Sequence, residues 1–154
     1  MTHTPTRNLL THIAGILSDN GAGVYKPTTG YEASDTAILM KTMPDKPDRC
    51  ITLNWVPADT NPAIPHMTGI LQVACRGNPD RPLDSDDLAD TCDTWLDGLT
   101  QSDCGDGTVI NLCNHRNTVN MGQDDLKRWV TAVQYTVELD VPGTGWKPDT
   151  GAWQ

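Results

Sequence analysis

The stretch that most constrains the fold runs from residue 69 to residue 99, because it combines a strand, a tight turn and an amphipathic helix. Leu71, Val73 and Cys75 alternate with polar or small residues, a period of two that is typical of a strand with one buried face. A Gly-Asn-Pro-Asp turn at 77–80 then breaks the strand. The apolar residues after the turn recur at helical spacing, and they are Leu88, Cys92, Trp95, Leu96 and Leu99. The stretch therefore predicts a strand that leads into a helix with one apolar face.

The opposite side of this predicted helix is acidic, with aspartates at positions 86, 87, 90, 93 and 97. Asp84 or Ser85 is placed to cap the first amides of the helix, and carboxylates in the first turn suit the helix dipole. An acidic row of this kind is usually a solvated face, but it also suits a basic partner. Asp86, Asp90 and Asp93 are therefore candidate interface residues.

The rest of the chain adds one more helix and several strands. Pro5 begins a helix that ends near Asn20, and the clearest strand runs over 129–141, whereas Pro57 is expected to end a strand and begin a loop over 57–68. The candidate core residues are Leu71, Val73, Cys92, Trp95, Leu99, Val133, Tyr135 and Val137. This order predicts a single α+β domain over 1–141, with a mainly antiparallel β-sheet and two α-helices packed on one face.

Charge and hydropathy exclude two classes of partner. The net charge is −9, and the 11 Lys and Arg residues are spread along the chain with no basic block, so the clustered positive surface that a nucleic-acid binder needs is not expected. There is no apolar run long enough to span a bilayer and no signal segment, so we expect no membrane contact and a protein that stays in the compartment where it is made.

Catalytic and metal-binding patterns are weak. The five cysteines are an odd number and are expected to be reduced thiols. Cys104, Cys113 and His115 are possible metal ligands by residue type, but their spacing matches no compact Cys/His pair. Cys75 and Cys92 fall on faces expected to be buried, which argues against an activated thiol. We therefore predict no catalytic residue, no metal and no cofactor, as in an interaction or structural protein.

Three segments resemble a known family. They are residues 44–53, residues 71–76 leading into the helix, and Gly122-Gln123-Asp124 followed by Arg128 and the strand over 132–141. In this order they are similar to the tail terminator (minor capsid) proteins of long-tailed bacteriophages, and the resemblance covers nearly the whole chain.

The resemblance implies an α+β subunit of a homohexameric ring in the virion, at the tail–neck junction, made in the host cytoplasm. Such a ring caps the tail tube protein, stops its polymerisation and joins the tail to the head–neck completion or connector protein. DNA passes through the ring without specific binding, and no catalysis or cofactor is implied. Two alternatives stay open: another neck or tail component, such as a head completion or tail-tube subunit, and a small enzyme or inhibitor.

Four aromatic residues outside the predicted core complete the candidate interface. Tyr25 and Tyr31 lie in or next to a polar loop, and Trp146 and Trp153 lie in the Gly- and Pro-rich extension over 142–154. The extension is too short to form a core of its own. It is expected either to fold back on its own subunit or to be an arm that crosses to a neighbour, since Trp is enriched among residues that dominate interfaces.

Overall fold

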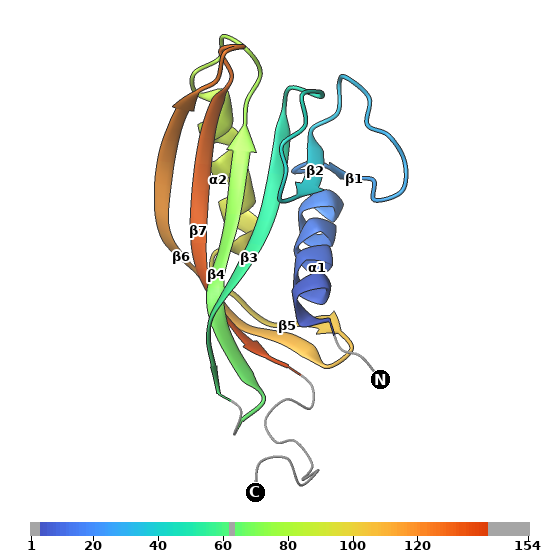
Figure 1. Cartoon of the computed structure of the whole chain (residues 1–154), viewed down its shortest axis with the longest axis vertical. Helices are drawn as coiled ribbons and strands as arrows, with labels where there is room; N and C mark the ends of the chain where they lie inside the picture. Colours follow the sequence, from blue (N-terminus) through green and yellow to red (C-terminus); the bar gives the residue numbers. More distant parts are fainter. Residues whose placement is uncertain (1–3, 62–63, 142–154) are drawn as a thin grey trace, which may run out of the picture.

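The computed structural model describes residues 4–61 and 64–141, which form one curled sheet with two helices (Figure 1). The elements in chain order are α1 (Pro5–Asp19), β1 (Val24–Tyr25), β2 (Ala37–Met40), β3 (Cys50–Asn61), β4 (His66–Arg76), α2 (Asp84–Leu96), β5 (Leu99–Gly105), β6 (Thr108–Gln123) and β7 (Trp129–Asp140). The first helix, the helix after the turn and the last strand are all close to their predicted positions.

The sheet is mixed and has the strand order β1-β2-β3-β4-β7-β6-β5. The pairs β3–β4, β4–β7, β7–β6 and β6–β5 are antiparallel, whereas the pairs β1–β2 and β2–β3 are parallel. The prediction of a mainly antiparallel sheet is therefore roughly right, but it did not include the two parallel pairs. They arise because the loops over 26–36 and 41–49 return the chain to the same end of the sheet before the next strand begins.

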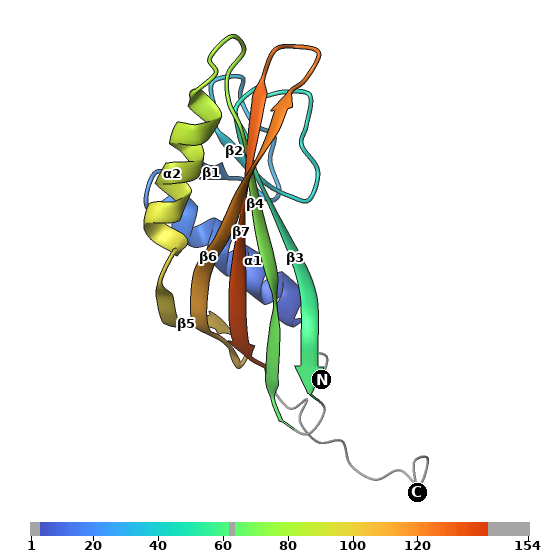
Figure 2. The same cartoon turned by 90° about the vertical axis from the view of Figure 1, so that its left-hand side faces the viewer.

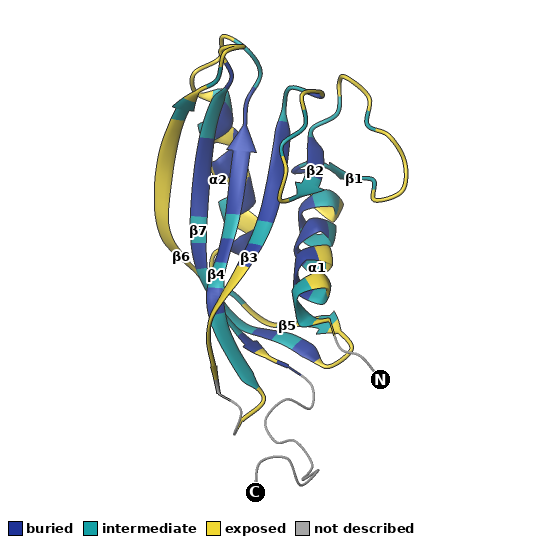
Figure 3. Cartoon of the chain, viewed as in Figure 1, coloured by how far each residue is buried: buried dark blue, intermediate teal, exposed yellow. Residues whose placement is uncertain are grey.

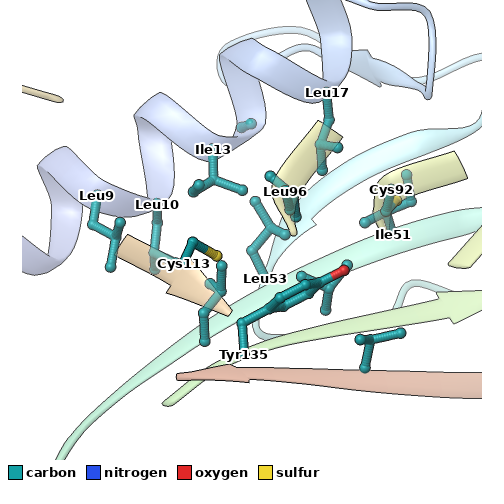
Figure 4. Packing of buried hydrophobic residues seen from close by; sticks show 14 of the residues in the cluster. Leu9, Leu10, Ile13, Leu17, Ile51, Leu53, Cys92, Leu96, Cys113 and Tyr135 are labelled. Carbon is teal, nitrogen blue, oxygen red and sulfur yellow. The ribbon is translucent and has the colours of Figure 1, made fainter. Parts of the chain in front are cut away.

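Both helices share one hydrophobic core with the sheet. α2 contacts β4 and β7, and α1 contacts strands from both ends of the sheet, β1 and β2 at one end and β5 and β6 at the other (Figure 2). Leu9, Ile13 and Leu17 of α1 pack with Leu96 of α2 and Tyr135 of β7 in this core (Figure 4). The curl of the sheet around α1 is what closes the core.

Most of the predicted core residues are buried. Six of the eight candidates are at most 2% exposed, and they are Leu71, Val73, Cys92, Val133, Tyr135 and Val137. The prediction for Trp95 is wrong, because 42% of this residue is exposed. Trp95 and Leu96 are neighbours about 100° apart around a helix, and the fully buried Leu96 takes the position that faces the core. Leu99 is only half-buried, because α2 ends at Leu96 and Leu99 begins β5 instead.

Two strands continue through segments that are poor strand formers. β3 continues past Pro57 to residue 61, so the expected loop over 57–68 is mostly a β-hairpin. β2 pairs with β3 only as far as Leu53, so one edge of β3 is unpaired at Pro57. The N–H that proline lacks therefore removes no hydrogen bond of the sheet on that side. In the same way β6 continues through the polar residues 114–120, because β5 pairs with it only as far as Cys113. Polar side chains are tolerated where a strand is an exposed edge.

Candidate assembly surfaces

Two buried arginines hold the loop between β2 and β3 against the sheet. Arg76, at the end of β4, is 4% exposed. Its guanidinium donates hydrogen bonds to the carbonyl oxygens of Pro44 at 2.6 Å, Pro47 at 2.9 Å and Asp48 at 2.7 Å. Three backbone acceptors of one loop are thus satisfied by one side chain, which fixes the loop conformation.

Arg128, just before β7, completes this arrangement and is also 4% exposed. Its guanidinium donates to the Asp124 carboxylate at 2.8 Å, to the Asp48 carboxylate at 3.0 Å and to the carbonyl of Asp45 at 2.6 Å. We call Arg76, Arg128, Asp48 and Asp124 the arginine cluster. It brings together the three segments on which the family resemblance rests, so their shared role in this chain is to join the β2–β3 loop to β4 and to the β6–β7 turn.

The carboxylates of the arginine cluster are held in their ionised form. The ammonium group of Lys46, with help from Arg128, lowers the pKa of Asp48. Burial opposes ionisation of Asp124, but hydrogen bonds from the backbone and guanidinium of Arg128 outweigh it and lower the pKa of Asp124. Because both folded-state pKa values lie below the unfolded values, the cluster stabilises the fold above about pH 4 and loses this contribution as the pH falls.

The three candidate aspartates of α2 have different surroundings. Asp90 is exposed. Asp86 accepts a hydrogen bond from the Thr131 hydroxyl at 2.7 Å, and Asp93 accepts one from the Tyr135 hydroxyl at 2.7 Å and contacts His115 Nδ1 at 2.8 Å. Two of the three carboxylates therefore connect α2 to the sheet. Burial and the neighbouring Asp93 carboxylate raise the pKa of Tyr135, so its hydroxyl stays a donor in this network.

The two candidate tyrosines both lie near the β1 edge. Tyr25 and Met40 are partly buried against the core and line a groove with Arg7 and Leu10 of α1. The Tyr31 hydroxyl accepts a hydrogen bond from the backbone N–H of Lys26 at 3.0 Å and donates one to the carbonyl of Ile38. Tyr31 thus orders the loop before β2, while Tyr25 reaches a surface groove. Trp146 and Trp153 lie outside the described residues.

The thiols and histidines form hydrogen bonds and core contacts. Burial raises the pKa of Cys104 to about 11 and that of Cys113 to about 12, so both stay protonated at neutral pH. Within residues 4–61 and 64–141 no group of three His, Cys, Asp or Glu is arranged to hold a metal ion. His12 of α1 lies 2.6 Å from the Ser102 hydroxyl of β5, and burial lowers the pKa of this histidine. No sequence pattern identified this pair, because 90 residues separate its members.

Replacing Trp95 with Ala tests how the exposed side of α2 contributes to stability. Since Trp95 is 42% exposed, we expect the free energy of unfolding to fall by about 1–2 kcal/mol. Leu96→Ala, at the adjacent fully buried position, should lower it by about 2–5 kcal/mol. Urea denaturation of both variants gives the two values. A larger loss for Trp95→Ala than for Leu96→Ala would contradict this assignment of the helix faces.

These interactions all lie within the subunit. The buried arginines, the Asp93 network and the His12–Ser102 pair each connect different elements of the fold. Their role in this chain is to hold the subunit together. No helix in the described ranges is long and apolar enough to cross a membrane.

Comparison with known families shows the class of protein. Residues 16–141 match the family described as bacteriophage tail terminator protein. This match spans more than half of the chain, so the chain belongs to the bacteriophage tail terminator family and is a structural component of a phage tail. As a terminator it interacts with other tail components. A comparison with curated proteins gives no match.

Proposed function

We propose that this chain forms a homohexameric ring that caps the tail tube, stops its polymerisation and joins the tail to the head–neck connector. The observation that carries the proposal is the family match over residues 16–141. The arginine cluster supports it, because a subunit that must present a defined surface to a growing tube benefits from loops fixed by buried hydrogen bonds. The partners in this proposal are other copies of the chain, the tail tube protein and a head–neck completion protein.

The capping role predicts a direct effect on tube growth. Adding the protein to purified tail tube protein should shorten the tubes, with a larger effect as the ratio of terminator to tube subunits increases, because each capped end stops adding subunits. Tube lengths measured in negative-stain micrographs give the result, and an acidic protein of similar size serves as the control. Identical length distributions with and without the chain would reject the capping role and favour another position in the neck.

The proposed passage of DNA through the ring predicts that the protein does not retain DNA. The net charge is −9, and two of the arginines, Arg76 and Arg128, are buried in hydrogen bonds and are not available to phosphates. We therefore expect no shift of duplex DNA in a gel even at about 20 mM salt, where phosphate contacts are strongest. A shift that disappears as salt is added would contradict the proposed passive passage.

A further inference from the structure

The face of the sheet that points away from the helices carries no charge in three adjacent rows of its four central strands, which lie between the row of Arg76 and the row of Glu138. The pairing register places three rows of four residues across β3, β4, β7 and β6. We call these positions the uncharged sheet face, and they are Thr52, Ala74, Ala132 and Val119; Asn54, Gln72, Gln134 and Asn117; and Val56, Ile70, Thr136 and Asn114. None of the twelve is charged in a chain that has 11 Lys and Arg and 20 Asp and Glu residues.

The helices do not cover this face. The buried residues of α1 and α2 pack with Leu53, Val73 and Tyr135, which belong to the alternate positions of the same strands. Figure 1 shows the helix-free side toward the viewer, and Figure 3 shows that exposed positions gather along β6 and the lower part of β3. Val56 is 51% exposed and Val119 41%. Thr52, Ala74 and Ala132, in the row nearest Arg76, are buried. The other nine positions combine apolar with uncharged polar side chains, and depletion of charge is typical of the centre of a protein–protein interface.

One end of the uncharged sheet face has a hollow and exposed basic residues beside it. Lys41, Met43 and Met121 line the hollow together with residues of the sheet. Lys41 and, in the β6–β7 turn, Lys127 are exposed and form no ion pair among the residues that the structure describes. The ammonium groups of Lys41 and Lys127 are therefore available to carboxylates of another molecule, and the same turn also holds Asp124, which pairs with Arg128, and the exposed Asp125.

The opposite side of the molecule has complementary properties. On the outward side of α2, Asp87 and Asp90 are exposed, and neither carboxylate has an ion-pair partner in the described part of the chain. Leu83, just before this helix, is 67% exposed and Trp95 is 42% exposed. α2 and the uncharged sheet face lie on opposite sides of the sheet (Figure 2). Each subunit thus has the uncharged sheet face, with Lys41 and Lys127 at one end, on one side and an acidic helix with two exposed apolar side chains on the other.

We propose that α2 of one copy docks on the uncharged sheet face of the next copy, with Leu83 and Trp95 as apolar anchors and Asp87 and Asp90 facing Lys41 and Lys127. This inference rests on the proposed ring and assigns the two surfaces that form it. Contacts between two different patches are head-to-tail, and they close into a ring when the rotation between copies closes. Opposite charges at the rim set the partner and the register.

Charge reversal tests this pairing. The sheet-side variant carries Lys41→Glu and Lys127→Glu, and the helix-side variant carries Asp87→Lys and Asp90→Lys. All four residues are exposed, so both variants should keep the wild-type circular dichroism spectrum and melting temperature within a few degrees. Each variant alone places like charges at the interface, and we expect its self-association constant to fall about tenfold or more.

An equimolar mixture of the two variants gives the decisive result. The new glutamates of the sheet-side variant then face the new lysines on α2 of the helix-side variant. At the other contact, the unchanged α2 of the sheet-side variant faces the unchanged sheet of the helix-side variant. The mixture should therefore assemble with the two variants alternating. Native mass spectrometry measures both the mass and the composition of the assembly. Arg7→Glu and Asp19→Lys, at exposed positions of α1 outside both surfaces, are matched controls and should assemble as wild-type does.

The outcomes separate this inference from the ring itself. A ring that forms equally well with wild-type, sheet-side and helix-side proteins would overturn the assigned surfaces and leave the ring proposal in place. A wild-type protein that stays monomeric, alone and with tube protein, would reject the ring and this inference with it. Trp95→Ala gives a further check, because it should lose assembly while remaining folded, and normal assembly of this variant would argue against Trp95 as an anchor.

Discussion

Replacing Arg128 with Ala should lower the free energy of unfolding by about 3 kcal/mol, a large part of the total stability of a domain this size. The Arg128 side chain is 5% exposed and bridges Asp124, Asp48 and the carbonyl of Asp45. Removing the guanidinium leaves the Asp124 carboxylate without its counter-charge, leaves Asp48 with Lys46 alone, and leaves one carbonyl without its donor. The loss comes mainly from these remaining groups, since a partly buried charge without a partner costs more than the pair contributes.

Urea denaturation at several pH values measures this effect. At pH 7 the difference between wild-type and Arg128→Ala should be largest. It should shrink below about pH 4, because protonation of Asp48 and Asp124 removes the charges that Arg128 neutralises. Arg7→Ala, at an exposed arginine of α1, is the control and should change stability by less than about 0.5 kcal/mol. A pH-independent difference would show that Arg128 acts by packing rather than by charge.

Ending the chain after Val141 should abolish ring formation while leaving the subunit folded. We propose that residues 142–154, with Trp146 and Trp153, act as an arm on a neighbouring subunit. Val141 is 3% exposed, and its backbone N–H donates to the carbonyl of Pro65 at 3.1 Å, so the described fold is anchored up to this point. Removal of the extension should therefore change the melting temperature little and the assembly strongly, since Trp residues commonly dominate interface energies.

Thermal melting and light scattering on the truncated chain measure stability and assembly separately. A second variant, with Trp146→Ala and Trp153→Ala in the full-length chain, tests whether the two indoles account for the effect. A large fall in melting temperature would show that the extension packs on its own subunit. A stable truncated chain that still forms rings and caps tubes would reject the arm.

The sequence predicted elements whose periodicity is strong and missed features that depend on distant neighbours. The alternation over 129–141 identified β7, since a strand with one buried face has a period of two. The extension of β3 past Pro57 could not be predicted, because it depends on β2 ending early and leaving an edge. Trp95 was misplaced for a related reason. Adjacent residues of a helix point about 100° apart, and the sequence alone did not show that Leu96 rather than Trp95 points toward the core.

The functional surfaces were predicted less well than the fold. The resemblance identified the segments that hold Arg76 and Arg128, but it did not show that they meet in space and hold one loop. Asp93 was predicted at an interface because it is acidic, and its hydrogen bond to the buried Tyr135 could be seen only once the sheet was placed against α2. The uncharged sheet face could not be recognised from the sequence either, since its residues alternate with core residues along four strands whose pairing was not known.

The contact of α1 with strands at both ends of the sheet determines when the protein can fold during synthesis. Leu9, Ile13 and Leu17 leave the ribosome first, yet they are buried against β5 and β6 as well as against β1 and β2. β7, the last strand made, lies in the middle of the sheet between β4 and β6. The apolar side of α1 therefore stays uncovered until β7 has been made. A topology with such distant contacts folds slowly for its size. A nascent chain that stops before β7 has no completed sheet on which to bury its first helix.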